Sequence, residues 1–520
     1  MIKAKIGYLL LLIMMVFMSC QRKEETRTNT LHLNFQEGDL PSLHPYNLMI
    51  YLRGISIGKT LFEGLTRIDE KGQPQLAGAK SITVSPNGLE YSISLRENYW
   101  SDGTAVVASD YENAWKEALS STSNCPRADL IYMLKNAEKA KKGEISVNAV
   151  GVKAQDTQTL LITLEYPSSH FLELLAQPIC APLANIHEKE PSKFNGPFQV
   201  AEWKHGDYLH LIKNPHYWDK EKIALEHIQI YMVQDTMTAF TMFEKGQIDW
   251  IGVPFVPLSS ELIQHLGKQN ALRSHPVDRS FLVFLNTQSL PLTSASIRQA
   301  LNLSFDRKAV TEHIFSAGKP LKKPLPESLL ATSPSFELYE DLVVANQFLE
   351  QGLQELNLTR ETFPPLTITY SQQAGRKQLA EYLQQAWTKG LNIPVKIEPQ
   401  EWNVFRVNLG NGNYQISGSF DAPFYNDPLE LLQKLVRYGP NNFPQWTNGQ
   451  FTEIVNQARN TSDSQERLAL LAQAEEILIK EVPFIPVSSD EFIFSHHPDL
   501  KGYTFDCVGA CDFSRATLKK

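Results

Sequence analysis

The sequence has no cluster of basic residues and only one long apolar run. It carries 49 Lys and Arg against 57 Asp and Glu, a formal net charge of -8. No segment supplies the basic stripe that phosphate binding requires, which argues against a nucleic-acid partner. Outside residues 6–18, no run approaches the roughly 20 apolar residues of a membrane-spanning helix. The body of the chain is therefore predicted to be a soluble α/β protein of ordinary globular composition.

The common catalytic signatures are also missing. We find no G-x-S-x-G elbow, H-E-x-x-H helix, Walker loop or G-x-G-x-x-G turn. The 13 histidines are scattered, and the adjacent pair His496-His497 cannot share one face of a strand or helix. The sequence therefore predicts no enzyme and no catalytic residue.

Cysteine is scarce, with five residues in the chain: Cys20, Cys125, Cys180, Cys507 and Cys511. Cys507 and Cys511 either close a small disulfide loop or are two free buried thiols, and the spacing leaves both possibilities open. No second Cys/His pair occurs at ligand spacing, so we predict no metal site and no cofactor.

The one apolar run lies at the N-terminus. Residues 6–18 (IGYLLLLIMMVFM) follow Lys3 and Lys5 and are too short to span a bilayer, which is typical of a signal peptide over residues 1–19. The following Phe17-Met18-Ser19-Cys20 resembles the bacterial lipobox, although Phe17 and Met18 depart from its usual residues. We expect Cys20 to carry lipid and residues 20–30 to form a flexible tether to the membrane.

Alternating and helical hydrophobic patterns run through the rest of the chain. The clearest set is a strand over 366–371, a helix over 376–389 and a strand over 393–399. Strand, helix, strand at this spacing predicts a βαβ unit and a locally parallel sheet. Further predicted elements are a strand over 89–97, a helix over 109–121 with Ser109 as its N-cap, and a helix over 235–246.

Four segments, in order, resemble the solute-binding proteins of ABC importers, in the oligopeptide/dipeptide/nickel-binding family. They are LFEGLTRIDEKGQPQLAGAKSITVSPNGLEYSISLRENYWSDGTAVVASDYENAWK (61–116), FNGPFQVAEWKHGDYLHLIKNPHYW (194–218), VFLNTQSLPLTSASIRQALNLSFDRKAV (283–310) and QERLALLAQAEEILIKEVPFIPV (465–487). The resemblance covers nearly the whole mature chain.

The resemblance implies a two-lobed periplasmic-binding-protein fold with a hinge. Lobe I would take residues 31–66, 178–276 and 488–520, with an extra small domain over 67–177, and lobe II would take 277–487. Such lobes close on a ligand that contacts both of them, here about strands near 277 and 488.

The implied function is to bind short peptides, including peptidoglycan-derived ones, outside the cytoplasmic membrane. The protein would deliver them to ABC transporter permease subunits, as a monomeric, membrane-anchored lipoprotein in the periplasm or on the cell surface. Within the family, a nickel-chelate or haem binder is the alternative. From other classes, the alternatives are a peptide sensor or adhesin and an exported hydrolase.

Peptide-binding relatives carry a Gly-Trp-x-Ala-Asp-Tyr-x-Asp/Glu-Pro motif whose Asp pairs with the peptide amine. When the motif is aligned on Asp427-Pro428, its Asp falls on Phe424 and its Trp on Asp421. The facing segment of lobe I offers Arg53 and no acid. The candidate ligand-binding residues are Tyr51, Arg53, Gly54, Phe420, Asp421, Ala422, Phe424 and Tyr425.

This departure suggests that the amine pocket has lost one or two carboxylates and gained a cation, which favours ligands with an extra carboxylate. The alternative is that Asp421 reaches the amine from a shifted strand position.

Overall fold

The structure, a computed structural model, describes residues 29–168, 170–326, 329–330, 340–373, 375–436, 441–461 and 463–518. The predicted signal peptide, Cys20 and most of the predicted tether lie outside this part of the chain. No helix in the described ranges is long and apolar enough to cross a membrane.

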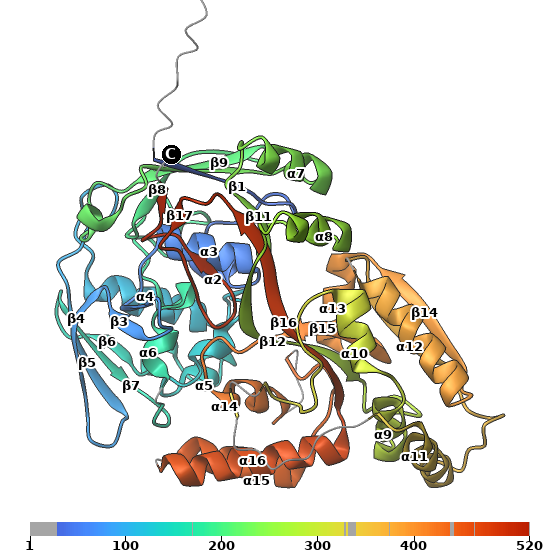
Figure 1. Cartoon of the computed structure of the whole chain (residues 1–520). Helices are drawn as coiled ribbons and strands as arrows, with labels where there is room; N and C mark the ends of the chain where they lie inside the picture. Colours follow the sequence, from blue (N-terminus) through green and yellow to red (C-terminus); the bar gives the residue numbers. More distant parts are fainter. Residues whose placement is uncertain are drawn as a thin grey trace, which may run out of the picture.

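A four-stranded sheet with a parallel β1–β10 edge forms one end of the molecule (Figure 1). Its strands, in spatial order, are β1 (Thr30–Asn34), β10 (His227–Tyr231), β9 (Tyr208–Lys213) and β8 (Phe198–Lys204). Their inward side chains, such as Leu31 and Leu209, are fully buried. The core beneath them is covered by helices α3 (Leu52–Leu61), α7 (Thr236–Glu244) and α8 (Ser260–Lys268).

A second four-stranded sheet, within the predicted extra domain, has its own core. Its order is β4 (Ala79–Val84), β5 (Glu90–Leu95), β7 (Thr159–Thr163) and β6 (Val152–Ala154). Trp100 and Trp115, from the adjoining loop and helix α4 (Ala108–Leu119), are buried against it. The strand predicted over 89–97 is β5.

The predicted N-cap of α4 is wrong. Val107, not Ser109, is the N-cap, and the backbone N–H of Val107 donates to the Asp110 carboxylate at 3.0 Å. Asp110, at the third helical position, accepts from the N-cap amide, which is the half of a capping box that does not require Ser or Thr at the N-cap.

The largest sheet runs through both lobes. Its order is β11 (Trp250–Gly252), β16 (Phe484–His496), β12 (Arg273–Leu285), β15 (Ile416–Asp421), β13 (Leu366–Ser371) and β14 (Val395–Gln400). Strands β12 and β16 are 13 residues long each and pass from one lobe to the other at the centre of Figure 1. Their pairing register shifts between Val277 and Ser280, at the predicted hinge.

The βαβ unit of lobe II forms as predicted. Strands β13 and β14 are parallel, and helix α12 (Arg376–Gly390) connects them. The helix buries Leu379, Leu383 and Trp387. The other helices of lobe II are α9 (Ala295–Leu303), α10 (Arg307–Val310), α11 (Leu342–Glu355), α13 (Trp402–Asn411), α14 (Pro428–Leu432), α15 (Gly449–Asn460) and α16 (Ser464–Glu481).

Cys507 and Cys511 are free thiols, as are Cys125 and Cys180. Cys511 is fully buried, and burial raises the pKa of its thiol well above the usual range. Of the two possibilities left open by the sequence, the structure has the reduced pair.

Candidate functional site

Three parallel strands of the largest sheet have their carboxyl ends at one edge. β13 pairs in parallel with both β14 and β15, so the three strands end at the same edge of the sheet, near Ser371, Gln400 and Asp421. Ligands of open α/β sheets bind at such an edge, because the loops that leave the strands diverge there.

The chain leaves β15 and passes directly into contact with lobe I. The Gln177 side-chain amide donates to the carbonyl of Phe424 at 3.4 Å, and the backbone N–H of Asn426 donates to Glu173 at 2.9 Å. The Cys507 thiol donates to the carbonyl of Pro423 at 3.6 Å. The segment that carries most of the predicted site residues is therefore an inter-lobe contact.

Asp421 is already matched by a cation of its own lobe. Lys434 lies 2.8 Å from the Asp421 carboxylate and 3.3 Å from that of Glu430. Arg127, from the extra domain, lies 3.0 Å from Asp129 and 3.5 Å from Glu430. Burial opposes the charged state of Arg127, but the carboxylates of Asp129, Glu430 and Asp421 outweigh it and raise its pKa above the ordinary value. We call these five side chains the Arg127 cluster.

Arg53 is not the uncompensated cation that the sequence suggested. It forms an ion pair with Glu37, which lies 16 residues upstream and outside the segment compared with relatives. Its guanidinium carbon also lies 4.8 Å from the ring centroid of Tyr51. Burial lowers the pKa of Arg53 to about 10, so it stays charged at neutral pH.

Of the remaining predicted residues, one contacts the opposite lobe and the others pack in the cores. Tyr51 reaches lobe II, since the guanidinium carbon of Arg406 lies 5.8 Å from its ring centroid. Gly54 is a packing residue: a Cβ there would meet the carbonyl oxygen of Leu48 at 2.5 Å. Tyr425 is buried among lobe I residues, and Ala422 and Phe424 pack against the same core. Phe420 packs on the aromatic core of lobe II.

Two arginines beside Phe420 were missed by the sequence reasoning. The guanidinium carbon of Arg279 lies 4.2 Å from the Phe420 ring centroid, and that of Arg376 lies 4.9 Å from it. Arg279 comes from the irregular part of β12, and Arg376 is the first residue of α12. We call Arg279, Arg376, Phe281, Phe315 and Phe420 the arginine–phenylalanine cluster.

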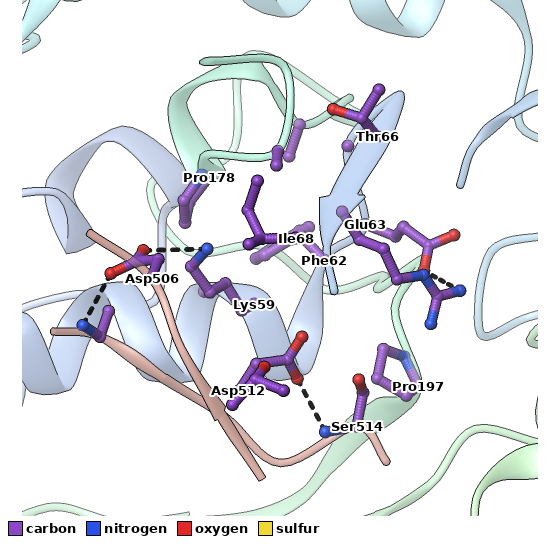
Figure 2. A pocket seen from close by; sticks show the side chains of 17 residues that line it. Lys59, Phe62, Glu63, Thr66, Ile68, Pro178, Pro197, Asp506, Asp512 and Ser514 are labelled. Atoms are coloured by element: carbon purple, nitrogen blue, oxygen red, sulfur yellow. Dashed lines mark hydrogen bonds and ion pairs between the residues drawn. The ribbon is translucent and has the colours of Figure 1, made fainter. Parts of the chain in front are cut away.

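Lobe I also encloses a small polar cavity of about 30 Å³, shown in Figure 2. Lys59 lies 3.0 Å from Asp506 in its wall, and Arg67 lies 3.2 Å from Glu63. Burial opposes the charge of Lys59, but Asp506 and Asp512 together raise its pKa above the ordinary value. A space of this size suits a water molecule rather than a peptide. In the described ranges, no group of three or more His, Cys, Asp or Glu side chains could hold a metal ion.

Comparisons with known proteins agree over nearly the whole chain. The family described as "Bacterial extracellular solute-binding proteins, family 5 Middle" matches residues 73–443. "Oligopeptide-binding protein OppA" of Bacillus subtilis is 32% identical over 515 residues, which cover 96% of this chain and 94% of that protein. "Dipeptide-binding protein DppE" of the same organism is 32% identical and covers 88% of this chain and 86% of that protein.

The solved structures agree in fold. The substrate-binding domain of an oligopeptide ABC transporter from Bacillus anthracis has a TM-score of 0.82 at 26% identity, covering 95% of this chain and 99% of that chain. The Escherichia coli murein tripeptide binding protein MppA has a TM-score of 0.85 at 23% identity, covering 95% and 99%. These matches confirm the two-lobed fold predicted from the sequence, and the chain belongs to family 5 of the bacterial extracellular solute-binding proteins.

Proposed function

We propose that this protein captures short peptides outside the cytoplasmic membrane and delivers them to the permease of an ABC importer. The observation that carries this proposal is whole-chain similarity to relatives described as oligopeptide- and dipeptide-binding, combined with a sheet edge at which three parallel strands present their carboxyl ends. A relative described as a murein peptide-binding protein is 26% identical, which keeps peptidoglycan-derived peptides among the candidate ligands.

The side chains around this sheet edge suit a peptide. An extended peptide can add to sheet edges through its backbone, so affinity does not depend on one particular side-chain sequence. Phe420, Tyr51 and Arg406 supply aromatic and cationic surface from both lobes. In the Arg127 cluster three carboxylates accompany two cations, so a peptide amine near Asp421 would meet a net negative group.

Native mass spectrometry of the purified protein, followed by calorimetry with tri- to pentapeptides, tests the proposal. We expect a peptide mass to accompany the native protein, or defined peptides to bind to the emptied protein with micromolar or tighter affinity. Failure of every peptide in the panel to bind would overturn the proposal.

Ligand binding is proposed to close the lobes about the irregular pairing of β12 and β16. Small-angle scattering of the emptied protein, with and without a peptide whose binding is verified, measures this. A smaller radius of gyration with peptide is expected. Equal radii in the two states would remove the hinge from the account.

We further propose that Cys20 is lipidated, anchoring the protein to the membrane at the periplasmic side or the cell surface. Replacing Cys20 with Ala should move the protein from the membrane fraction to the soluble fraction. A Cys20→Ala protein that stays with membranes through detergent-free washing would show that the anchor is elsewhere.

A further inference from the structure

Two histidines meet on the outer face of the four-stranded sheet at the top of Figure 1. His210 lies on β9 and His227 on the neighbouring β10, and both are half-buried. The Nε2 atom of His210 is 3.2 Å from the Nδ1 atom of His227, and the two rings are inclined by 25°. Alternate residues of these strands, such as Leu209 and Ile228, form the core, so the histidine side chains project from the opposite face.

The pairing of strands brings these two histidines together. They are 17 residues apart, which is wider than the spacing of about two to five intervening residues between paired ligands in common zinc motifs. β9 and β10 are antiparallel, with His210 opposite Gln229 and His227 opposite Ile212, so the histidines lie diagonally across the two strands. The sequence-based prediction of no metal site rested on ligand spacing along the chain, which does not register pairs formed between strands.

The contact between the two rings contributes little to the fold by itself. One ring nitrogen must carry the hydrogen and the other must accept it, because two lone pairs at this distance would repel each other. On a half-exposed face, water can replace either partner of such a neutral hydrogen bond. Other histidines of lobe I lie beside acids instead, His32 beside Asp249 and His205 beside Asp39.

The distance between the two nitrogens suits a metal ion. Zn²⁺ binds histidine nitrogens at about 2.0–2.1 Å, so two nitrogens 3.2 Å apart would subtend about 100–106° at the ion, close to the tetrahedral angle. Rotation of the two rings about their Cβ–Cγ bonds would direct both lone pairs at one point. Imidazole nitrogens favour Zn²⁺, Ni²⁺ and Cu²⁺, whereas Mg²⁺ and Ca²⁺ prefer oxygen ligands.

A carboxylate lies on the same face as the histidine pair. Glu202 of β8 is directly opposite His210, so the two side chains share this face of the sheet. The nearby Lys204 has another acid, since its Nζ atom is 2.7 Å from the Asp207 carboxylate. Glu202 therefore adds negative charge that favours a cation. Within the described ranges it does not complete a group of three ligands, so water would fill the remaining positions around an ion.

We propose that His210 and His227 form a binding site for one divalent late transition-metal ion, such as Zn²⁺, Ni²⁺ or Cu²⁺. The ring that donates its hydrogen in the metal-free protein would carry it on its other nitrogen, so both rings would bind the ion as neutral imidazoles. The ion would then cross-link β9 to β10. Both histidines belong to lobe I, and none of the inter-lobe hydrogen bonds described above involves them. The site is therefore independent of the proposed peptide-binding function, and either proposal can fail alone.

Calorimetry with the purified protein, carrying no histidine tag and dialysed against a chelator, tests the site. We expect one Zn²⁺ to bind per chain, and Cu²⁺ to bind more tightly than Zn²⁺, in the general order for nitrogen ligands. Mg²⁺ should not bind. The electron paramagnetic resonance spectrum of the protein with one equivalent of Cu²⁺ should show coupling to two imidazole nitrogens.

His227→Gln should weaken Zn²⁺ binding at least about tenfold, since even the partners of metal ligands contribute that much to affinity. The matched control is His205→Gln, which removes a 70% exposed histidine from the turn between β8 and β9 of the same sheet. It should bind Zn²⁺ as the wild-type protein does. Circular dichroism should show both variants folded, and neither substitution should change the affinity for peptides.

Three results would overturn the site. The first is the absence of stoichiometric binding of Zn²⁺, Ni²⁺ and Cu²⁺ by the wild-type protein. The second is a Cu²⁺ spectrum with coupling to fewer than two nitrogens. Neither measurement needs a variant, so both hold even if His227→Gln does not fold. The third is unchanged Zn²⁺ affinity in folded His227→Gln, which would place the ion elsewhere on the chain.

Discussion

Arg127 and Arg376 each pack on a phenylalanine ring of the same short segment, which comprises the end of β15 and the residues after it. The guanidinium carbon of Arg127 lies 4.3 Å from the Phe424 ring centroid, and that of Arg376 lies 4.9 Å from the Phe420 centroid. Arg127 has Asp129 and Glu430 beside it, whereas the strongest charged neighbour of Arg376 is another arginine. The pKa of Arg127 is accordingly raised and that of Arg376 is lowered.

The difference separates two uses of a buried cation. Removing a charge from water costs several kcal/mol, and carboxylates within the fold offset that cost only where they are present. The Arg127 cluster supplies its own carboxylates and therefore joins the extra domain to lobe II. The arginine–phenylalanine cluster offsets only part of the free energy needed to remove its arginine charges from water. A ligand could offset the rest. Three changes test this comparison, in decreasing order of expected effect.

Removing Arg127 should have the largest effect. Arg127→Met would leave three carboxylates facing a single cation, Lys434, so we expect the free energy of unfolding to fall by about 3–5 kcal/mol. Chemical denaturation at pH 7 measures this. The control is Lys142→Met, which removes an exposed i,i+4 partner of Glu138 and should change stability by less than about 0.5 kcal/mol. A loss below about 1 kcal/mol for Arg127→Met would mean that the cluster does not stabilise the fold.

His44 extends the comparison to a second buried group without a charged partner. It is 2% exposed, both ring nitrogens lack partners, and burial lowers its pKa to about 4 from 6.5. The folded state therefore excludes the proton. The resulting stability is complete above pH 6.5 and is lost as the pH falls through about 4, a change of up to about 3 kcal/mol.

Denaturation curves collected between pH 7 and pH 4 measure the contribution of His44. His44→Leu should flatten the decline in stability over this window, because it removes the titrating ring while keeping an apolar side chain. The same substitution at exposed His187 should leave the decline unchanged. Parallel declines in wild type and His44→Leu would show that other groups control acid stability.

The smallest effect is expected for Arg376→Met in the absence of ligand. Loss of the cation–ring contacts costs roughly 0.5–1 kcal/mol, and relief of the uncompensated charge offsets it. The unfolding free energy should change by less than about 1 kcal/mol in either direction. A loss above 2 kcal/mol would show that the fold already compensates Arg376, which would sharply weaken the contrast with Arg127.

Sequence reasoning worked best where structure depends on local pattern. Strand β13 was predicted at its observed bounds, and α12 and β14 within two residues, because periodicity and flanking turns carry that information. The N-cap of α4 was predicted wrongly because Ser109 was taken as the capping residue. The cap is Val107, whose backbone N–H donates to the Asp110 carboxylate.

The pairing of charged side chains in the site could not be predicted from local sequence pattern. Arg53 is compensated by Glu37, and Asp421 by Lys434, partners 16 and 13 residues away along the chain. Arg376 was placed at the start of its helix, but its three phenylalanine neighbours come from β12, the segment after α10 and β15. Which charges are compensated depends on contacts between distant segments, and a single sequence does not contain that information.

The position of β16 in the largest sheet has a consequence for the order in which the chain can fold. β11 pairs only with β16 in that sheet, and Lys59 near the N-terminus pairs with Asp506 near the C-terminus. A chain made from its N-terminus therefore presents the apolar residues of lobe I, Trp250 among them, before their C-terminal partners exist. Contacts of such long sequence separation slow folding and prolong exposure of apolar surface. The lobe that starts first along the chain is completed last, so aggregation during synthesis competes with folding until the final 35 or so residues arrive.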